Sequence, residues 1–346
     1  MGYKYHQQAK FMLAAVQSVE GTPVTPAGSD AIATFTPDFT LNISNETFKY
    51  AGSELDRSEG LVITDKYVEF SADSFLPALS PLATGIAASN SNFPLYRLFA
   101  AAGATVTYDA GTGVAAKVTV SNSTTGSTLL TTDLIQESSA DATNQNLYRC
   151  YDCRAQADLD ITIGSKAKLN WKMMGNTFDT IPANAGQFPK LQNPKLVPSY
   201  GTQKSSVLPS VRMSQITLAE LQPIGTTFTG GTTKNFCIQK LTAANLFGFE
   251  YGRFLTGCEE GFDKGAVTTD VVMTVLTDRA DATFVPEKML ELEYHYQLAW
   301  GTVVGQRCKI IFDSLKVSNI SRTTIGNQIA NDITFRNNGS VTIEFS

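Results

Sequence analysis

Histidine is the side chain that most often serves as a base near neutral pH, and this chain has only two. A Ser-His-Asp or Cys-His nucleophilic site would therefore have to use His6 or His295. His6 lies near the start of the sequence. His295 lies among alternating polar and apolar residues, on what we expect to be the polar face of a strand. Such a position is typical of a solvated or interface side chain, so neither histidine predicts a catalytic site.

Two pairs of carboxylates have the residue types of a glycosidase acid and base. Their spacing of two residues is also the ordinary consequence of a polar strand face. For the first pair we expect cross-strand ion pairs, because two lysines lie on the strand predicted to face it. The carboxylate pairs are Asp158 with Asp160 and Glu291 with Glu293, and the lysines are Lys168 and Lys172.

The only Cys-x-x-Cys motif is formed by Cys150 and Cys153, among five cysteines. Zinc would need two further ligands at short spacing, and thioredoxin-like redox chemistry would need a helix directly after the motif. Neither context occurs in the sequence. Because the number of cysteines is odd and the others are scattered, we expect structural thiols rather than a disulfide framework, and the role of the motif stays open. The other cysteines are Cys237, Cys258 and Cys308.

The segment Gly111 to Ala116 matches the dinucleotide-binding pattern G-x-G-x-x-A, which requires a helix directly after it. The residues Lys117 to Ser121 instead have the β-branched pattern of a strand. The segment therefore predicts a turn, and no Walker-type phosphate loop occurs elsewhere. With no cofactor, metal or nucleophile site predicted, the chain is expected to be a structural building block and not an enzyme.

The composition is that of a globular protein without the excess of basic residues that is typical of nucleic-acid binding. The 346 residues are 42% hydrophobic and 17% charged, with a net charge of −5. A basic protein surface is the usual signature of nucleic-acid binding, whereas here the acidic excess lies before residue 188. No apolar run approaches the roughly 18 residues that span a bilayer. We expect a soluble protein that is made in a reducing cytoplasm.

Period-two alternation dominates the sequence and predicts a mainly β fold. Residues Phe39 to Ile43 predict a half-buried strand, followed by a polar loop at Tyr50 to Gly60 and a second strand at Val62 to Phe70. Two hairpins are expected. One joins Ala157–Ile163 to Ala167–Met173 through a short Gly164 turn, and one closes the chain around Asn338 and Gly339.

The order of strand, loop, strand, helix and hairpin occurs twice, which predicts two tandem domains. The expected helices are Phe93 to Ala102, ending before Gly103, and a shorter one opened by Pro286 to Lys288. We assign residues 1–180 to the first domain, 181–209 to a Pro-rich linker and 210–346 to the second domain. Residues 104–145 are Thr- and Ser-rich and are expected to be an elaboration of the first domain.

Several segments resemble phage tail tube proteins, the major tail proteins of the long-tailed phages. The stretch Glu20-Gly21-Thr22-Pro23 is similar to the opening of that family, and Phe93 to Gly103 is similar to its helix. Leu147 to Gly175 is similar to two consecutive family strands, although Cys150 to Cys153 replace the usual glycine turn. In the second half, Leu241 to Phe249 and Leu298 to Gly305 are similar to further family stretches, whereas residues 104–145 do not align.

The resemblance implies β-sandwich or split-barrel domains, each with a flanking helix, that contribute strands to an oligomeric β-barrel tube. Stacked rings would form the conduit for genome delivery in the virion tail, and DNA would pass through the lumen without specific binding. The implied partners are further copies of the chain and the tape measure, tail terminator and baseplate proteins. The polar loop at Tyr50 to Gly60 would reach the adjacent ring through Glu54, Asp56, Arg57 and Glu59.

Two questions stay open at this point. The apparent duplication predicts rings of three chains with pseudo-sixfold symmetry, and the alternative is a hexamer with the second half outside. The alternative functions are a phage or bacterial surface adhesin or decoration protein that binds glycans, and a carbohydrate-active enzyme.

Overall fold

The computed structural model of the protein is mainly β, as expected. The structure describes residues 8–27, 30–32, 35–49, 59–76, 89–90, 93, 95–109, 117–122, 128–138, 144–175, 177–180, 187–189, 216–229, 238–252, 261–264, 269–276, 289–302 and 307–346. Among these residues, no helix has the length and apolar character needed to cross a membrane.

The elements of the first half include a long hairpin after the first strand and end with short strands. They are β1 (Gln8–Gln17), β2 (Phe35–Lys49), β3 (Glu59–Phe75), α1 (Tyr96–Ala101), β4 (Ala104–Asp109), β5 (Lys117–Asn122), β6 (Leu129–Ser138), β7 (Asn144–Thr162), β8 (Lys168–Gly175), β9 (Thr177–Thr180) and β10 (Gln187–Pro189).

Nine strands are defined among the described residues of the second half. They are β11 (Ile216–Pro223), β12 (Ile238–Ala243), β13 (Phe249–Gly252), β14 (Gly261–Lys264), β15 (Thr269–Leu276), β16 (Glu293–Trp300), β17 (Cys308–Ile325), β18 (Gln328–Asn337) and β19 (Val341–Phe345).

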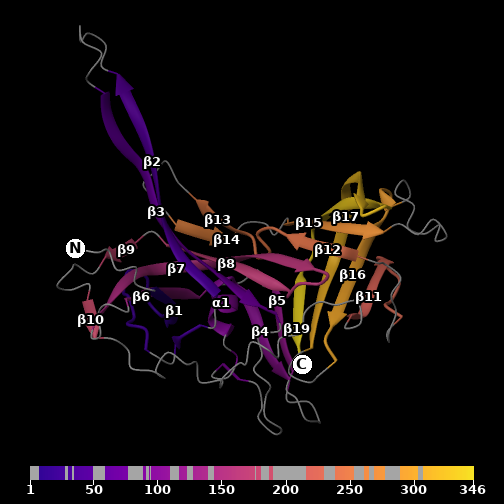
Figure 1. The fold of residues 1–346 in the computed structure, drawn as a ribbon, viewed down its shortest axis with the longest axis horizontal. Helices are drawn as coiled ribbons and strands as arrows, with labels where there is room; N and C mark the ends of the chain where they lie inside the picture. Colours follow the sequence, from indigo (N-terminus) through magenta and orange to yellow (C-terminus); the bar gives the residue numbers. More distant parts are fainter. Residues whose placement is uncertain are drawn as a thin grey trace.

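Strand β7 pairs with strands of both halves of the chain (Figure 1). Its second part pairs with β8 along one edge and with β12 along the other. From β8 the sheet continues to β3 and β2, and from β12 it continues to β15, β18, β17, β16 and β11. The first part of β7 pairs with β6, which carries β1, and with β9 and β10. Both predicted domains therefore contribute to one hydrogen-bonded sheet.

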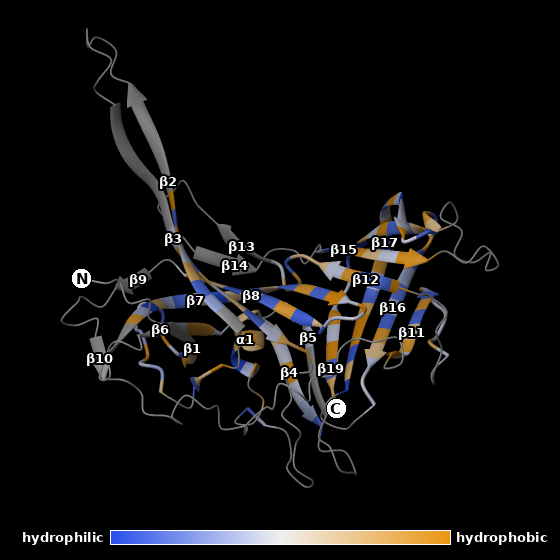
Figure 2. Cartoon of the chain, viewed as in Figure 1, coloured by the Kyte–Doolittle hydropathy of each residue, from blue (hydrophilic) through white to orange (hydrophobic). Residues whose placement is uncertain are grey.

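The hairpin of β7 and β8 forms as its alternation predicts. Leu159 pairs with Leu169, and the turn uses Gly164 at a φ of 92°. The apolar side chains of both strands are buried on one face while polar residues alternate with them (Figure 2). Period-two patterning is sufficient here because both strands are adjacent in sequence and one face meets the core.

The hairpin predicted at the end of the chain is wrong. Strands β18 and β19 pair with successive parts of β17, and β19 pairs with β5 on its other edge. The two strands thus follow one another along β17 instead of folding back. Gly339 lies at the break between them, where an added Cβ would come within 2.8 Å of the Ser314 backbone nitrogen. The Asn-Gly pair marks a close approach to β17 and not a hairpin turn.

Residues 104–145 are more than an elaboration of the first domain. Strand β5 pairs with β19 of the second half, and β4 pairs with β5. Strand β6 lies between β1 and β7, and its Leu130 and Leu134 are fully buried. The segment therefore completes both parts of the core.

Helix α1 packs at the meeting point of the two halves. Its Phe99 contacts Trp171, Phe247 and Phe345, with ring centroids 5.1, 5.8 and 6.3 Å away. The helix is shorter than expected, and Gly103 follows it at a φ of 66°. The second predicted helix, at Pro286 to Lys288, lies outside the described residues. The two-domain division itself stays a prediction, because most of residues 181–209 also lie outside them.

Candidate assembly surface

The hairpin of β2 and β3 is the most prominent projection of the molecule (Figure 1). Strand β3 pairs with β8 only through Val68–Phe75. In the part of the chain that the structure describes, the preceding residues of β3 pair with β2 alone, out to Glu59 opposite Lys49. The inner part of this hairpin thus belongs to the large sheet, whereas its outer part is a ribbon of two strands only.

The predicted assembly residues Glu54, Asp56 and Arg57 lie outside the described residues, in the part of the sequence between β2 and β3. Glu59 is the first residue of β3. The strands that flank this loop are longer than the alternation indicated, so the predicted loop follows a projecting ribbon. Its role in assembly stays a prediction.

An apolar row runs along β2 from the core into the ribbon. Phe39 stacks on Tyr148 with ring centroids 4.6 Å apart and meets the edge of Phe70 at 6.1 Å. The next two apolar residues, Leu41 and Ile43, are 41% and 43% exposed. The expectation of a half-buried strand holds for Phe39 and is wrong for Leu41 and Ile43. The apolar face continues beyond the core that would cover it.

Strands at the edges of the sheet are a second feature to which another subunit can bind. Among the described residues, β4 pairs only with β5, β11 pairs only with β16, and β2 pairs only with β3. An edge strand presents unpaired backbone N–H and C=O groups, which another strand can use. The edges lie on different sides of the molecule (Figure 1).

The carboxylates Asp158 and Asp160 have structural partners. Asp158 accepts a 2.7 Å hydrogen bond from the backbone N–H of Asn245, and Lys172 Nζ lies 3.8 Å away. Asp160 accepts a 3.0 Å hydrogen bond from the Thr162 hydroxyl. Both carboxylates are therefore held by contacts within the protein.

The ion pairs differ in detail from the expected register. Asp158 lies directly opposite Asn170, so Lys172 reaches it diagonally. Lys168 is opposite Asp160 but lies 3.6 Å from Asp73 on β3. The neighbouring strand β3 supplies the second carboxylate, which the hairpin sequence alone does not reveal.

The second carboxylate pair does not form on one strand face. Strand β16 begins at Glu293, and Glu291 lies in the turn before it. His295 is on β16, where its ring stacks on Phe228 with centroids 3.9 Å apart. Its Nε2 atom is buried without a hydrogen-bond partner in the described structure. His6 and the segment Gly111 to Ala116 lie outside the described residues.

No cluster of three or more His, Cys, Asp or Glu residues suited to a metal ion occurs among the described residues. Of the cysteines, Cys150, Cys153 and Cys308 are buried free thiols, whereas Cys237 and Cys258 are outside the described residues. Burial raises the pKa of the Cys308 thiol, and the charge of Glu344 adds to the effect.

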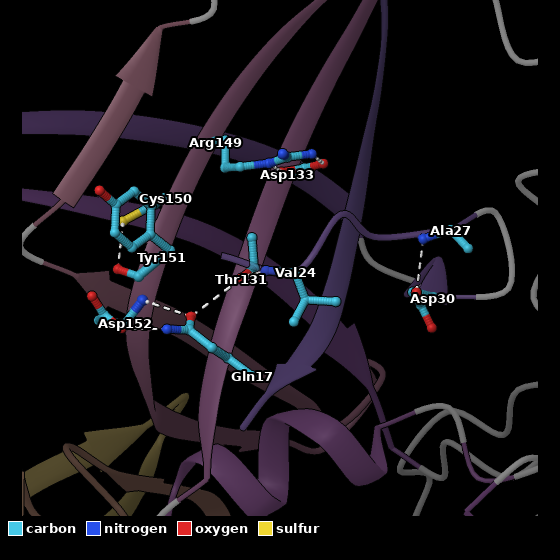
Figure 3. A network of polar contacts seen from close by, with 10 residues as sticks. All are labelled: Gln17, Val24, Ala27, Asp30, Thr131, Asp133, Arg149, Cys150, Tyr151 and Asp152. Carbon is cyan, nitrogen blue, oxygen red and sulfur yellow. Dashed lines mark hydrogen bonds and ion pairs between the residues drawn. The ribbon is translucent and has the colours of Figure 1, made fainter. Parts of the chain in front are cut away.

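A polar network that sequence reasoning missed fixes the segment after β1 (Figure 3). The carboxylate of Asp152 accepts hydrogen bonds from the Gln17 side chain and from the backbone N–H of Gly21, the latter at 2.9 Å. Gln17 Oε1 accepts from the Asp152 N–H at 3.1 Å and from the Thr131 hydroxyl at 3.2 Å. Thr131 in turn accepts from the N–H of Val24 at 3.0 Å. The network joins β1, β6 and β7.

A second polar contact holds the same segment to the helix. Asp30 accepts a 2.7 Å charge-assisted hydrogen bond from Arg97 of α1 and a 2.8 Å bond from the N–H of Ala27. The segment after β1 is therefore held at Gly21 by Asp152 and at Asp30 by Arg97. The sequence alone does not indicate these contacts, because the partners are far apart along the chain.

A buried ion pair lies between β6 and β7 (Figure 3). Arg149 donates two hydrogen bonds to the carboxylate of Asp133, at 2.7 and 2.8 Å. The side chain of Asp133 is 1% exposed and that of Arg149 is 13% exposed. Burial raises the pKa of Asp133 although Arg149 acts in the opposite direction.

Glu220 on β11 is a fully buried carboxylate with a complete set of donors. One oxygen accepts from the side chain of Gln222 and from the N–H and hydroxyl of Thr229, and the other accepts from Gln297 at 2.8 Å. Burial by itself would raise its pKa, but these hydrogen bonds outweigh burial and lower the pKa.

We expect Glu220→Gln to reduce the free energy of unfolding by about 2 kcal/mol at pH 7, because hydrogen bonds to a charged acceptor are lost. A lowered pKa stabilises the fold above the unfolded-state value of 4.5, and this stabilisation is lost as pH falls through the folded-state pKa. The deficit of the variant should therefore shrink at pH 3. Urea unfolding at both pH values measures it, with the exposed Glu293→Gln as the control. An equal deficit at both pH values would contradict the assignment.

Comparison of the chain with known families and with curated proteins finds no family model and no curated protein that matches.

Proposed function

We propose that the protein is a structural virion protein, the major tail tube subunit of a long-tailed phage, which assembles into stacked rings around the genome conduit. The resemblance of the sequence segments supports this proposal, and so does a mainly β chain with open sheet edges. Its acidic net charge suits a lumen through which DNA moves, because Lys and Arg contacts to phosphates would retain the duplex.

The observation that carries the proposal is the apolar row on the projecting ribbon. Leu41 and Ile43 alternate as in a buried strand face, yet both are exposed in the single chain. Burial of apolar surface contributes about 25 cal/mol for each Å², so a neighbouring subunit that covers the row would gain association energy. A projecting two-stranded ribbon has little stability alone, and a partner in a stacked ring would supply the missing packing.

The two halves support a ring of three chains. Because β7 pairs with β12 and β5 pairs with β19, each chain forms one continuous arc of sheet. Three chains, each with two covalently linked halves, would close a ring at a smaller entropic cost of association than six separate chains. Cryo-electron microscopy of the tube tests this arrangement. Three chains per ring, with both halves at the lumen, agree with it, and six chains with the second half outside contradict it.

We expect the double substitution Leu41→Ser and Ile43→Ser to leave the chain folded but to abolish tube formation. Both side chains are already exposed in the single chain, so the fold loses little, whereas the proposed subunit contact loses its apolar row. Circular dichroism and thermal unfolding check the fold, and negative-stain electron microscopy of the concentrated protein checks for tubes.

The matched control is Thr40→Ala, an exposed position on the opposite face of the same strand. A deletion of Gly52 to Ser58 tests the predicted tip loop separately, and we expect it to prevent ring stacking. Normal tubes from the double variant would overturn the proposed contact. A wild-type chain that stays monomeric at high concentration and binds glycans would overturn the proposed function in favour of an adhesin.

A further inference from the structure

Cys150 and Cys153 point to the same face of β7 because the strand bulges between them. Residues three apart in a regular strand point to opposite faces. Here Thr132 pairs with Cys150 and Leu130 pairs with Cys153, so two residues of β7 face the single residue Thr131. One of these two, Asp152, has a φ of 57°. The bulge thus brings together two thiols that alternation would separate.

Both sulfur atoms lie beside Gly175 at the end of β8. An added Cβ at this glycine would lie 2.6 Å from Cys150 Sγ and 3.0 Å from Cys153 Sγ. Both thiols therefore lie next to the same position, the one that a side chain at residue 175 would occupy. Each cysteine is fully buried, and the nearby thiol of Cys153 together with burial raises the pKa of Cys150. A glycine opposite the pair leaves the space that the two sulfurs occupy.

We propose that Cys150 and Cys153 form a latent disulfide site, which closes within one chain when the protein meets an oxidising low-molecular-weight disulfide. The inference goes beyond the proposed function and does not depend on it. One feature of the structure favours ring closure over an open mixed disulfide, because the bulge already directs both sulfurs to one place.

The chemistry is ordinary thiol–disulfide exchange. The thiolate of one cysteine attacks the disulfide of the reagent, so a mixed disulfide forms and the first reagent thiolate leaves. The second cysteine thiolate then attacks the protein sulfur of that mixed disulfide, and the second reagent thiolate leaves. Two electrons pass from the cysteines to the reagent, and the two cysteine protons end on the reagent thiols.

Access to the thiols and their ionisation set the rate. The neighbouring strand β9 has four residues and pairs with Tyr148–Tyr151. Short edge strands open more readily than central ones, so we expect local opening to admit the reagent. The thiolate is the attacking species, and a raised pKa means that little thiolate is present at neutral pH. The reaction should therefore be slow at pH 7 and faster at pH 9.

The closed ring would also stiffen the anchor of the segment after β1. Asp152 lies between the two cysteines and accepts hydrogen bonds from Gln17 and Gly21. A disulfide across Asp152 would restrict the turn that presents its carboxylate. The redox state of the pair is thus coupled by geometry to the anchoring of this segment.

The test incubates the folded full-length chain with oxidised glutathione and then digests it without reduction. We expect two of the five thiols to disappear and one peptide link, between Cys150 and Cys153, to be found by mass spectrometry. In the Cys153→Ala variant this link and the paired thiol loss should vanish, whereas Cys308→Ala should still form the link.

The wild-type peptide map decides the proposal even if a variant fails to fold. Retention of all thiols at pH 9 would overturn it. So would glutathione adducts on Cys150 or Cys153 without the internal link, or links between chains. A rate that increases from pH 7 to pH 9, with the internal link as product, agrees with it.

Discussion

Replacement of Gly175 by alanine is expected to reduce the free energy of unfolding by about 3 kcal/mol or more. The new Cβ would lie 2.7 Å from the carbonyl oxygen of Tyr151, in addition to its contacts with two sulfur atoms. The thiol side chains have some freedom to rotate away, but the Tyr151 carbonyl belongs to the bulged backbone of β7. Relief of the contact would require β7 and β8 to separate.

Gly164→Ala is the matched control for this prediction. Gly164 has a φ of 92°, but an added Cβ there meets nothing within 4 Å. Its substitution should cost only the roughly 1–2 kcal/mol of a left-handed backbone. Urea unfolding followed by circular dichroism measures both variants. If Gly175→Ala were no more destabilising than Gly164→Ala, the close approach at the bulge would be wrong.

Asp133→Ala is expected to destabilise the fold by about 3–5 kcal/mol, because removal of one partner leaves a buried charge without its counterion. Arg149 would lose two short hydrogen bonds and could not regain full hydration between β6 and β7. The side chain removed is small, so the loss of apolar packing contributes little to this value. Urea unfolding at neutral pH measures it.

The control is Asp73→Ala, which removes the carboxylate from a half-exposed ion pair. Asp73 and Lys168 are 3.6 Å apart and each side chain is 33% exposed. Surface pairs of this kind contribute about 0.2–1 kcal/mol. An Asp133 variant that is no less stable than the Asp73 variant would show that the buried pair does not hold β6 to β7.

The pH dependence of Asp133 is opposite in sign to that of Glu220. Because burial raises the folded-state pKa of Asp133, the stabilisation that comes from this pKa shift is fully present below the unfolded-state value and is lost as pH rises through the folded-state pKa. Hydrogen bonds lower the pKa of Glu220, which therefore stabilises the fold only above that range. Acid unfolding of the wild-type chain includes both contributions along with those of the other titratable groups, so the two variants are needed to separate them.

Local pattern was sufficient for the fold class, the β7–β8 hairpin and the region of α1. Alternation of Leu159 and Ile161 with polar residues specifies a strand face, and the adjacent turn brings its partner within a few residues. Gly103 after the apolar run marks the helix end because its positive φ suits glycine. In each case the deciding interactions are between residues that are close in sequence.

Tertiary structure decided which strands pair and which apolar residues are covered. The Asn338-Gly339 pair predicted a hairpin, but β18 and β19 each pair with the longer strand β17 and not with each other. Ile43 has the pattern of a buried residue and is exposed, because it lies opposite Lys66, in the part of the hairpin that extends beyond β8.

The polar sites depended on tertiary structure in the same way. Asp152 lies 135 residues from Gln17 in sequence, and the bulge that aims its carboxylate also unites Cys150 with Cys153. Alternation places a side chain on one of two faces of its own strand. The alternation pattern does not reveal a bulge, after which side chains point to the opposite face from the one expected. It also does not reveal which distant strand supplies a counterion. For this protein the sequence therefore determined the kind of structure, and contacts between distant segments determined its pairings, its buried charges and its uncovered surface.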